Sequence, residues 1–229
     1  MLSDRVLVEK MHHPKNGNEA KIARRSAIFR EFFLFQMQLA QLLSQRNEDA
    51  PGVEKKYDLA AVKELIEEIP FELSDDQKKV VNEIFADLHS KRQMRRLLQG
   101  DVGSGKTVVA VFAIYAAVTA GYQAALMVPT EILAQQHFAK IDELLKPLGV
   151  RVALLTGDTK DLEKKEIYRE LADGTINVVI GTHALIQKDV HFKDLGLVII
   201  DEQHRFGVNQ RNTLIKKGDA PDILAMTAT

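Results

Sequence analysis

The residues best suited to chemistry lie in one short segment, 100–107, whose sequence GDVGSGKT fits the pattern G-x-x-x-x-G-K-[ST]. Glycines in such a segment allow backbone conformations that a side chain forbids, so successive N–H groups can turn toward phosphates at a helix N-terminus. The lysine can reach the β and γ phosphate oxygens, and the threonine hydroxyl can bind Mg²⁺. We therefore predict a site for ATP and Mg²⁺, with contacts from Gly100, Gly103, Ser104, Gly105, Lys106 and Thr107.

A pair of carboxylates follows the apolar run 195–200, LGLVII. Ligands of open α/β sheets bind at the carboxyl ends of the strands, so Asp201 and Glu202 are expected beside the phosphate segment. Asp201 is predicted to hold the Mg²⁺ shell, and Glu202 to orient or deprotonate the attacking water. Together with Lys106, these two acids are the candidate catalytic residues.

Both motifs need a sheet to hold them, and the rhythm of the sequence after Arg95 predicts one. Short apolar runs alternate with helical patterns at 106–119, 131–146 and 161–172; the runs are RLLQG, AALMV, VALLT, NVVIG, LGLVII and DILAMT. Continuous apolar runs suit parallel strands that are covered on both faces. Alternation of strand and helix implies right-handed crossovers. The fold class is therefore α/β, with a doubly wound, mostly parallel sheet.

The sequence before this region predicts a helical extension. Residues 1–19 are polar and rich in loop formers, and we expect an irregular tail there. Residues 20–46 lack Gly and Pro and carry apolar residues mostly at helical spacing, which predicts one long amphipathic helix that packs against the following domain. Residues 47–56 are interpreted as a linker. Helices are expected at 59–69 and 75–90.

One of these helices has a clear start signal. Ser74 is followed by Asp75 and Asp76, and Gln77 lies three residues after the serine. A hydroxyl N-cap, acids in the first turn and a glutamine at the third position form a capping box. The second helix of this pair is therefore predicted to begin at Asp75.

Composition excludes several classes of protein. The 229 residues carry 31 Lys plus Arg against 32 Asp plus Glu, and there is no cysteine, which rules out a disulfide scaffold, a thiolate zinc site and a cysteine nucleophile. No apolar run approaches the roughly 20 residues of a membrane span, and the first residues lack a signal-peptide pattern. A cytoplasmic location is the default expectation. The basic cluster at 91–96 is interpreted as a solvated turn.

The motifs together resemble those of a known family. GDVGSGKT, PTEILA, GTHAL, DEQH and TAT stand in the order of superfamily 2 helicase motifs. More narrowly, RLLQGDVGSGKTVVA, ALMVPTEILAQQH, LLTG, GTHALIQ, LVIIDEQHRFGVNQR and MTAT resemble the bacterial RecG branch-migration helicases. The resemblance is strong over about residues 70–229 and looser over 12–46.

The resemblance implies further site residues. It assigns adenine recognition to Gln77. It also implies that segments containing Thr130, Glu131, Gly157, Thr182 and His183 line the DNA backbone path, and that Gln203, His204, Thr227 and Thr229 couple nucleotide state to DNA contacts. By themselves, the two histidines would be interpreted as satisfied cap or core residues. Their position inside the motifs favours the functional interpretation.

The resemblance also implies a domain organisation and a partner. Residues 1–19 would be the end of a wedge domain, residues 20–56 a long helix and linker, and residues 57–229 a RecA-like, ATP-binding first motor domain. The expected activity is that of an ATP-dependent DNA helicase acting on branched double-stranded DNA, such as forks and Holliday junctions. The chain ends within TAT, which this family numbers as its third motif. We therefore expect a fragment that lacks the second RecA-like domain and most of the wedge, and that binds nucleotide without unwinding DNA.

Three alternatives remain open at this point. The motor of a transcription-repair coupling factor has a similar phosphate loop and acid pair, although DEQHRFG favours the RecG-like interpretation. A catalytically silent module that binds DNA or protein would explain the expected absence of a second motor domain. A metabolic P-loop kinase is disfavoured, because TAT, GTHAL and DEQH have no reason to occur together there.

Overall fold

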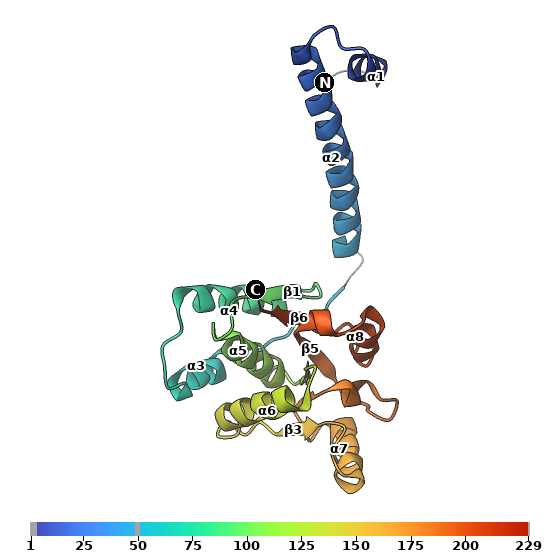
Figure 1. Cartoon of the computed structure of the whole chain (residues 1–229). Coiled ribbons are helices and arrows are strands. Elements are labelled where there is room, and N and C mark those ends of the chain that lie inside the picture. Colours follow the sequence, from blue (N-terminus) through green and yellow to red (C-terminus); the bar gives the residue numbers. More distant parts are fainter. Residues whose placement is uncertain (1–3, 49–50, 229) are drawn as a thin grey trace. The chain divides into compact units, whose positions relative to one another are not determined.

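The chain folds into two units, which are described separately. The computed structural model describes residues 4–48 and 51–228. One unit ends at Ala50 and the other begins at Pro51 (Figure 1). Within the described residues, no helix is long and apolar enough to cross a membrane.

The first unit is helical from near its start, contrary to the expected irregular tail. Helix α1 spans Asp4–His12 and helix α2 spans Gly17–Glu48. The loop formers at 13–16 make only the turn between them. Glu19 holds this turn, because its carboxylate pairs with Lys10 at 2.7 Å and accepts a 2.8 Å hydrogen bond from the backbone N–H of Lys15. Contacts across the turn thus stabilise α1, which the polar composition of residues 1–19 did not predict.

Helix α2 differs from the expected amphipathic helix in the distribution of its apolar side chains. The consecutive residues 32–35, FFLF, are all about half exposed or more. Four consecutive residues cover a full turn of an α-helix, so apolar side chains point to all sides. The predicted single stripe is wrong.

The boundary between the units lies at 50/51 rather than at the expected 56/57, because residues 51–56 form an extended strap on the second unit. The Gly52 N–H donates to the Lys91 carbonyl over 2.9 Å. The ammonium of Lys55 contacts the carboxylate of Asp222 at 2.6 Å, and both side chains are almost fully buried. The Tyr122 ring lies 5.1 Å from the same ammonium. These long-range contacts, rather than local composition, place the strap.

The two helices that follow the strap begin where the sequence predicts. Helix α3, Leu59–Glu68, is capped by the Asp58 carboxylate, which accepts hydrogen bonds from two backbone N–H groups of the first turn. Helix α4, Asp75–Leu88, begins with the predicted capping box of Ser74 and Gln77. The start of α4 is therefore fixed by local hydrogen bonds.

The sheet of the second unit has six strands, all parallel, in the order β1-β6-β5-β2-β4-β3. The strands are β1 Arg95–Gln99, β2 Gln123–Met127, β3 Val152–Leu155, β4 Val178–Gly181, β5 Leu195–Asp201 and β6 Asp222–Thr227. Every residue of β2 and β4 is buried, as expected for strands covered on both faces. The predicted sheet is confirmed.

Helices cover both faces of this sheet. The longer connections are α5 Lys106–Thr119, α6 Glu131–Leu145, α7 Asp161–Asp173 and α8 Val208–Ile215; the short helices are η1 His183–Ile186 and η2 Gln203–Arg205. Buried residues of α3, α4, α5 and α6 form one core cluster with alternate strand residues. Those of α7 and α8 form a second cluster with the other strand residues. The fold is therefore doubly wound.

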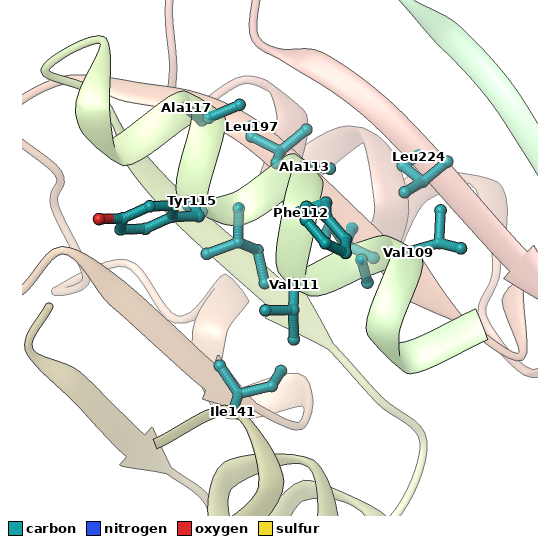
Figure 2. Close-up of a cluster of buried hydrophobic side chains, with 14 of the residues drawn as sticks. Val109, Val111, Phe112, Ala113, Tyr115, Ala117, Ile141, Leu197 and Leu224 are labelled. Carbon is teal, nitrogen blue, oxygen red and sulfur yellow. The ribbon is translucent and has the colours of Figure 1, made fainter. Parts of the chain in front are cut away.

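Helix α5 is the centre of the larger core. All residues from Val109 to Ala117 are buried, so the helix is enclosed on all sides. Figure 2 shows its side chains between Ile141 of α6 and Leu197 and Leu224 of the sheet. This enclosure fixes the start of α5, and with it the segment 100–105 that precedes the helix.

Candidate nucleotide-binding site

The phosphate segment connects the carboxyl end of β1 to the N-terminus of α5. Gly103 and Gly105 have φ values of +84° and +83°, in the left-handed region that favours glycine. A Cβ on Gly105 would also lie only 2.2 Å from Nε2 of Gln77. The backbone conformation therefore requires glycine at 105, and a Cβ there would also displace the Gln77 amide.

Lys106 is held across this loop. Its Nζ donates hydrogen bonds to the carbonyls of Gly100 at 2.7 Å and Asp101 at 2.8 Å. Thr107 follows in the first turn of α5, where the N-terminal N–H groups carry a partial positive charge. The ammonium, the threonine hydroxyl and the helix N-terminus thus converge on one short loop.

Gln77 ties helix α4 to the same loop. Its Nε2 donates to the Ser104 carbonyl over 3.0 Å, while its Oε1 accepts from the Ser74 N–H over 2.9 Å. Both ends of the amide are therefore engaged. A cavity of about 340 Å³ lies here, lined among others by Gln77, Gly100 and Lys106. A larger cavity of about 680 Å³ also borders the loop, with Lys106 and Phe71 among its lining residues.

The acid pair stands at the end of β5. The Oδ1 atom of Asp201 accepts a 2.9 Å hydrogen bond from the Glu202 N–H, and Oδ2 lies 2.9 Å from Nε2 of His137. Glu202 has φ 51° and ψ 49°, a left-handed conformation that is uncommon for a residue with a side chain. Its Oε2 lies 3.4 Å from Nδ1 of His204. Strain of this kind gathers at functional sites.

Strand β6 lies between the phosphate-loop strand and the acid-pair strand. Asp201 is level with Met226 of β6, and the Gly100 N–H donates to the carbonyl of Thr227 over 3.4 Å. The Thr227 hydroxyl donates to the Ala228 carbonyl over 3.1 Å. The structure therefore places the phosphate loop, the acid pair and Thr227 at one edge of the sheet. Thr229 lies outside the described residues.

The residues expected along a DNA path follow neighbouring strands at the same edge. The Thr130 hydroxyl caps α6, and Oε1 of Glu131 accepts from the Asp158 N–H over 3.3 Å. A Cβ on Gly157 would lie 2.9 Å from that Oε1. The loop that begins α6 and the loop that follows β3 are therefore in contact.

The remaining predicted residues lie on two short helices or directly before one of them. The Thr182 N–H donates to the Leu155 carbonyl over 3.3 Å, and the buried Thr182 hydroxyl has no hydrogen-bond partner among the described residues. His183 beside it is exposed. On η2, Oε1 of Gln203 accepts from Nη1 of Arg211 over 3.1 Å, and His204 is exposed. Because His204 is exposed, it is not a core residue, although it contacts Glu202.

The donor atoms present fit Mg²⁺ better than a transition metal. Within the described residues, no group of three or more His, Cys, Asp or Glu side chains gathers into a metal cage. Mg²⁺ is typically bound by one or two carboxylates, several waters and the phosphates of a substrate. Thr107 and Asp201 offer oxygen ligands of this kind.

The comparisons with known proteins agree with this geometry. The model of the DEAD/DEAH box helicase family matches residues 74–229. This chain belongs to that family. The match begins at the N-cap of α4 and includes the phosphate loop and the acid pair.

Within the family, the chain is similar to RecG. It is 52% identical over 219 residues to ATP-dependent DNA helicase RecG of Staphylococcus aureus and 49% identical to that of Bacillus subtilis, in each case over 96% of this chain. It spans 32% of the length of these curated relatives. A solved structure of RecG bound to a three-way DNA junction superposes with a TM-score of 0.81 at 44% identity, over 99% of this chain and 32% of that one. The resemblance stated from the motifs is confirmed, and the fold is RecA-like.

Sequence reasoning missed His137 as a part of this site. The histidine ends the string ALMVPTEILAQQH, but nothing in a string shows which strand its ring meets. A weak signal was present, because Ala134, His137, Ile141 and Leu145 share the buried face of α6. A single polar residue on an apolar helix face needs a hydrogen-bond partner.

Proposed function

We propose that this chain is the ATP-binding motor domain of an ATP-dependent DNA helicase that remodels branched double-stranded DNA. The observation that carries the proposal is the convergence, at one edge of a RecA-like sheet, of the loop 100–107 with the acid pair Asp201 and Glu202. The helicase family to which the chain belongs supports the reaction class.

The chain's own groups have separate tasks in this proposal. The loop N–H groups and Lys106 bind and orient the triphosphate, and Gln77 reads the adenine. Glu202 orients the attacking water and accepts its proton. Thr107 and Asp201 hold Mg²⁺, which would neutralise charge on the phosphates during transfer. Lys106 donates two of its three ammonium protons to backbone carbonyls, so contact with both the β and γ phosphates requires it to release at least one of them.

The DNA partner is inferred from the second group of residues. Thr130, Glu131, Gly157, Thr182 and His183 follow the carboxyl ends of β2, β3 and β4, apart from the strands that hold the nucleotide motifs. We assign them to the DNA backbone path. Gln203, His204, Thr227 and Thr229 are assigned to coupling between nucleotide and DNA. The RecG relative bound to a three-way junction supports forks and Holliday junctions as the substrate class.

The rest of the assembly is part of the same proposal. The curated relatives are about three times as long as this chain, and we infer that a second RecA-like domain and a wedge domain complete the enzyme. The isolated chain is then expected to bind nucleotide and to lack unwinding activity. A cytoplasmic location follows from the same proposal, since the relatives are bacterial DNA helicases and bacterial DNA lies in the cytoplasm.

A comparison of DNA substrates tests the function. ATP hydrolysis by the longer protein that contains this sequence is measured with a synthetic fork, a four-way junction and a linear duplex of equal length. Stimulation at least severalfold greater by the branched substrates is expected. Equal stimulation by all three would contradict the substrate assignment. Displacement of a stalled RNA polymerase would instead support the motor of a transcription-repair coupling factor.

A further inference from the structure

His137 of α6 and Asp201 of β5 form a polar contact in this site that no motif predicts. Nε2 of His137 lies 2.9 Å from Oδ2 of Asp201, and the two side chains are 10% and 13% exposed. An ionised carboxylate has no proton to give, so the ring nitrogen must donate. A neutral histidine with its proton on Nε2 is sufficient for this bond.

With this contact, both oxygens of the Asp201 carboxylate accept a hydrogen bond from the protein. Oδ1 of Asp201 already accepts from the Glu202 N–H over 2.9 Å, so each oxygen has one protein donor. Each carboxylate oxygen has a second lone pair. With one donor on each oxygen, rotation of the carboxylate about its last bond would break both hydrogen bonds. The remaining lone pairs therefore have a fixed direction.

The position of His137 on α6 argues against an incidental contact. Ala134, Ile141 and Leu145 occupy the same buried face of the helix. An apolar residue would pack there without a partner, whereas an imidazole without one would carry a desolvation cost. Nε2 of the ring finds its partner in the carboxylate that ends β5, which lies 64 residues away in the sequence.

We propose that His137 is a positioning residue that orients the Asp201 carboxylate for Mg²⁺ in the nucleotide complex. The inference rests on the proposed function, because it requires a Mg²⁺-nucleotide site at Asp201. Residues that hydrogen-bond to a metal-binding carboxylate orient it, and their loss typically lowers metal affinity or activity by about 10- to 100-fold.

Two substitutions separate positioning from packing. His137→Phe keeps a ring of similar size and removes the donor. His137→Gln removes the ring and keeps an amide nitrogen near the position of Nε2, so that it can donate to Asp201. If His137 only packs against its neighbours, nucleotide affinity should depend more on the ring than on the hydrogen-bond donor. If His137 positions Asp201, nucleotide affinity should depend more on the donor than on the ring.

The test is calorimetric titration of the 229-residue chain with a non-hydrolysable ATP analogue, in Mg²⁺ and in EDTA. His137→Phe is expected to bind about tenfold more weakly than the parent in Mg²⁺ and equally well in EDTA. His137→Gln is expected to recover most of the Mg²⁺-dependent affinity. Thermal unfolding shows whether His137→Phe folds. If it does not, His137→Asn replaces it, because the shorter amide does not reach Asp201. The same loss of affinity in Mg²⁺, but not in EDTA, is then expected.

The outcomes distinguish this inference from the function on which it rests. A parent that binds in Mg²⁺, with a donor-free variant that binds equally tightly, overturns the role of His137 alone. If His137→Phe loses as much nucleotide affinity in EDTA as in Mg²⁺, and His137→Gln does not restore it, the positioning role is also overturned. His137 is then a packing residue. A folded parent that binds no nucleotide in either condition overturns both proposals.

Discussion

The side-chain amide of Gln77 donates a 3.0 Å hydrogen bond to the carbonyl of Ser104, which joins the start of α4 to the phosphate loop. The same amide caps its own helix through the Ser74 N–H. One side chain therefore stabilises a helix end and supports the backbone on which a nucleotide would lie. The residue that the family resemblance assigns to adenine also has a structural task.

These two tasks can be separated by a matched pair of variants. Ser74→Ala and Gln77→Ala each break the capping box and should lower the free energy of unfolding by about 1 kcal/mol. Only Gln77→Ala also removes the loop contact, so only that variant should weaken binding of an ATP analogue. Urea denaturation and calorimetry measure the two effects. Equal nucleotide affinity of the two variants would contradict the role of Gln77 in the site.

A substitution of Glu202 separates nucleotide binding from ATP hydrolysis. Glu202→Gln keeps the shape and the backbone conformation of the residue but removes its capacity to accept a proton. In the longer protein, nucleotide affinity should stay close to that of the parent, and DNA-stimulated hydrolysis should fall by about 100-fold or more. Single-turnover rates and equilibrium titration measure these quantities. A parallel loss of affinity would argue that Glu202 binds the nucleotide instead.

The buried pair of Lys55 and Asp222 anchors the strap to the start of β6. Burial raises the pKa of Asp222, and the ammonium of Lys55 opposes that shift. Asp222→Leu would leave Lys55 buried without a counter-ion, at a typical cost of about 3–5 kcal/mol. Adding Lys55→Met should restore part of this loss. Recovery is incomplete because the Met94 N–H also donates to Asp222.

Urea denaturation of the parent, the single variant and the double variant measures that recovery. The expected order of stability places the double variant between the parent and Asp222→Leu. A double variant no more stable than Asp222→Leu would show that the buried charge of Lys55 is not the source of the loss.

The sequence predicted those elements whose structure depends on residues close together in the chain. The apolar runs of the strands, the capping box of α4 and the loop 100–107 each depend on neighbouring residues, and the structure has them all. The sheet edge that gathers the motifs also follows from strand direction, which alternation with helices already implies.

Contacts between distant residues account for what sequence reasoning missed. Helix α1 is supported across a turn by Lys10 and Glu19, and the strap is held by Asp222 from 167 residues away. The bond between His137 and Asp201 likewise joins separate elements. Motif spacing contains no information about such pairs, and neither does hydrophobic periodicity.

The central claim, that the loop 100–107 is a nucleotide site, is tested most directly with Lys106→Ala. Calorimetry with a non-hydrolysable ATP analogue and Mg²⁺ is compared for the parent, Lys106→Ala and Lys165→Ala, which removes an exposed lysine of α7. Saturable binding by the parent and by Lys165→Ala, with loss in Lys106→Ala, is predicted. Equal binding by all three folded proteins would contradict the claim, because the nucleotide would then bind elsewhere.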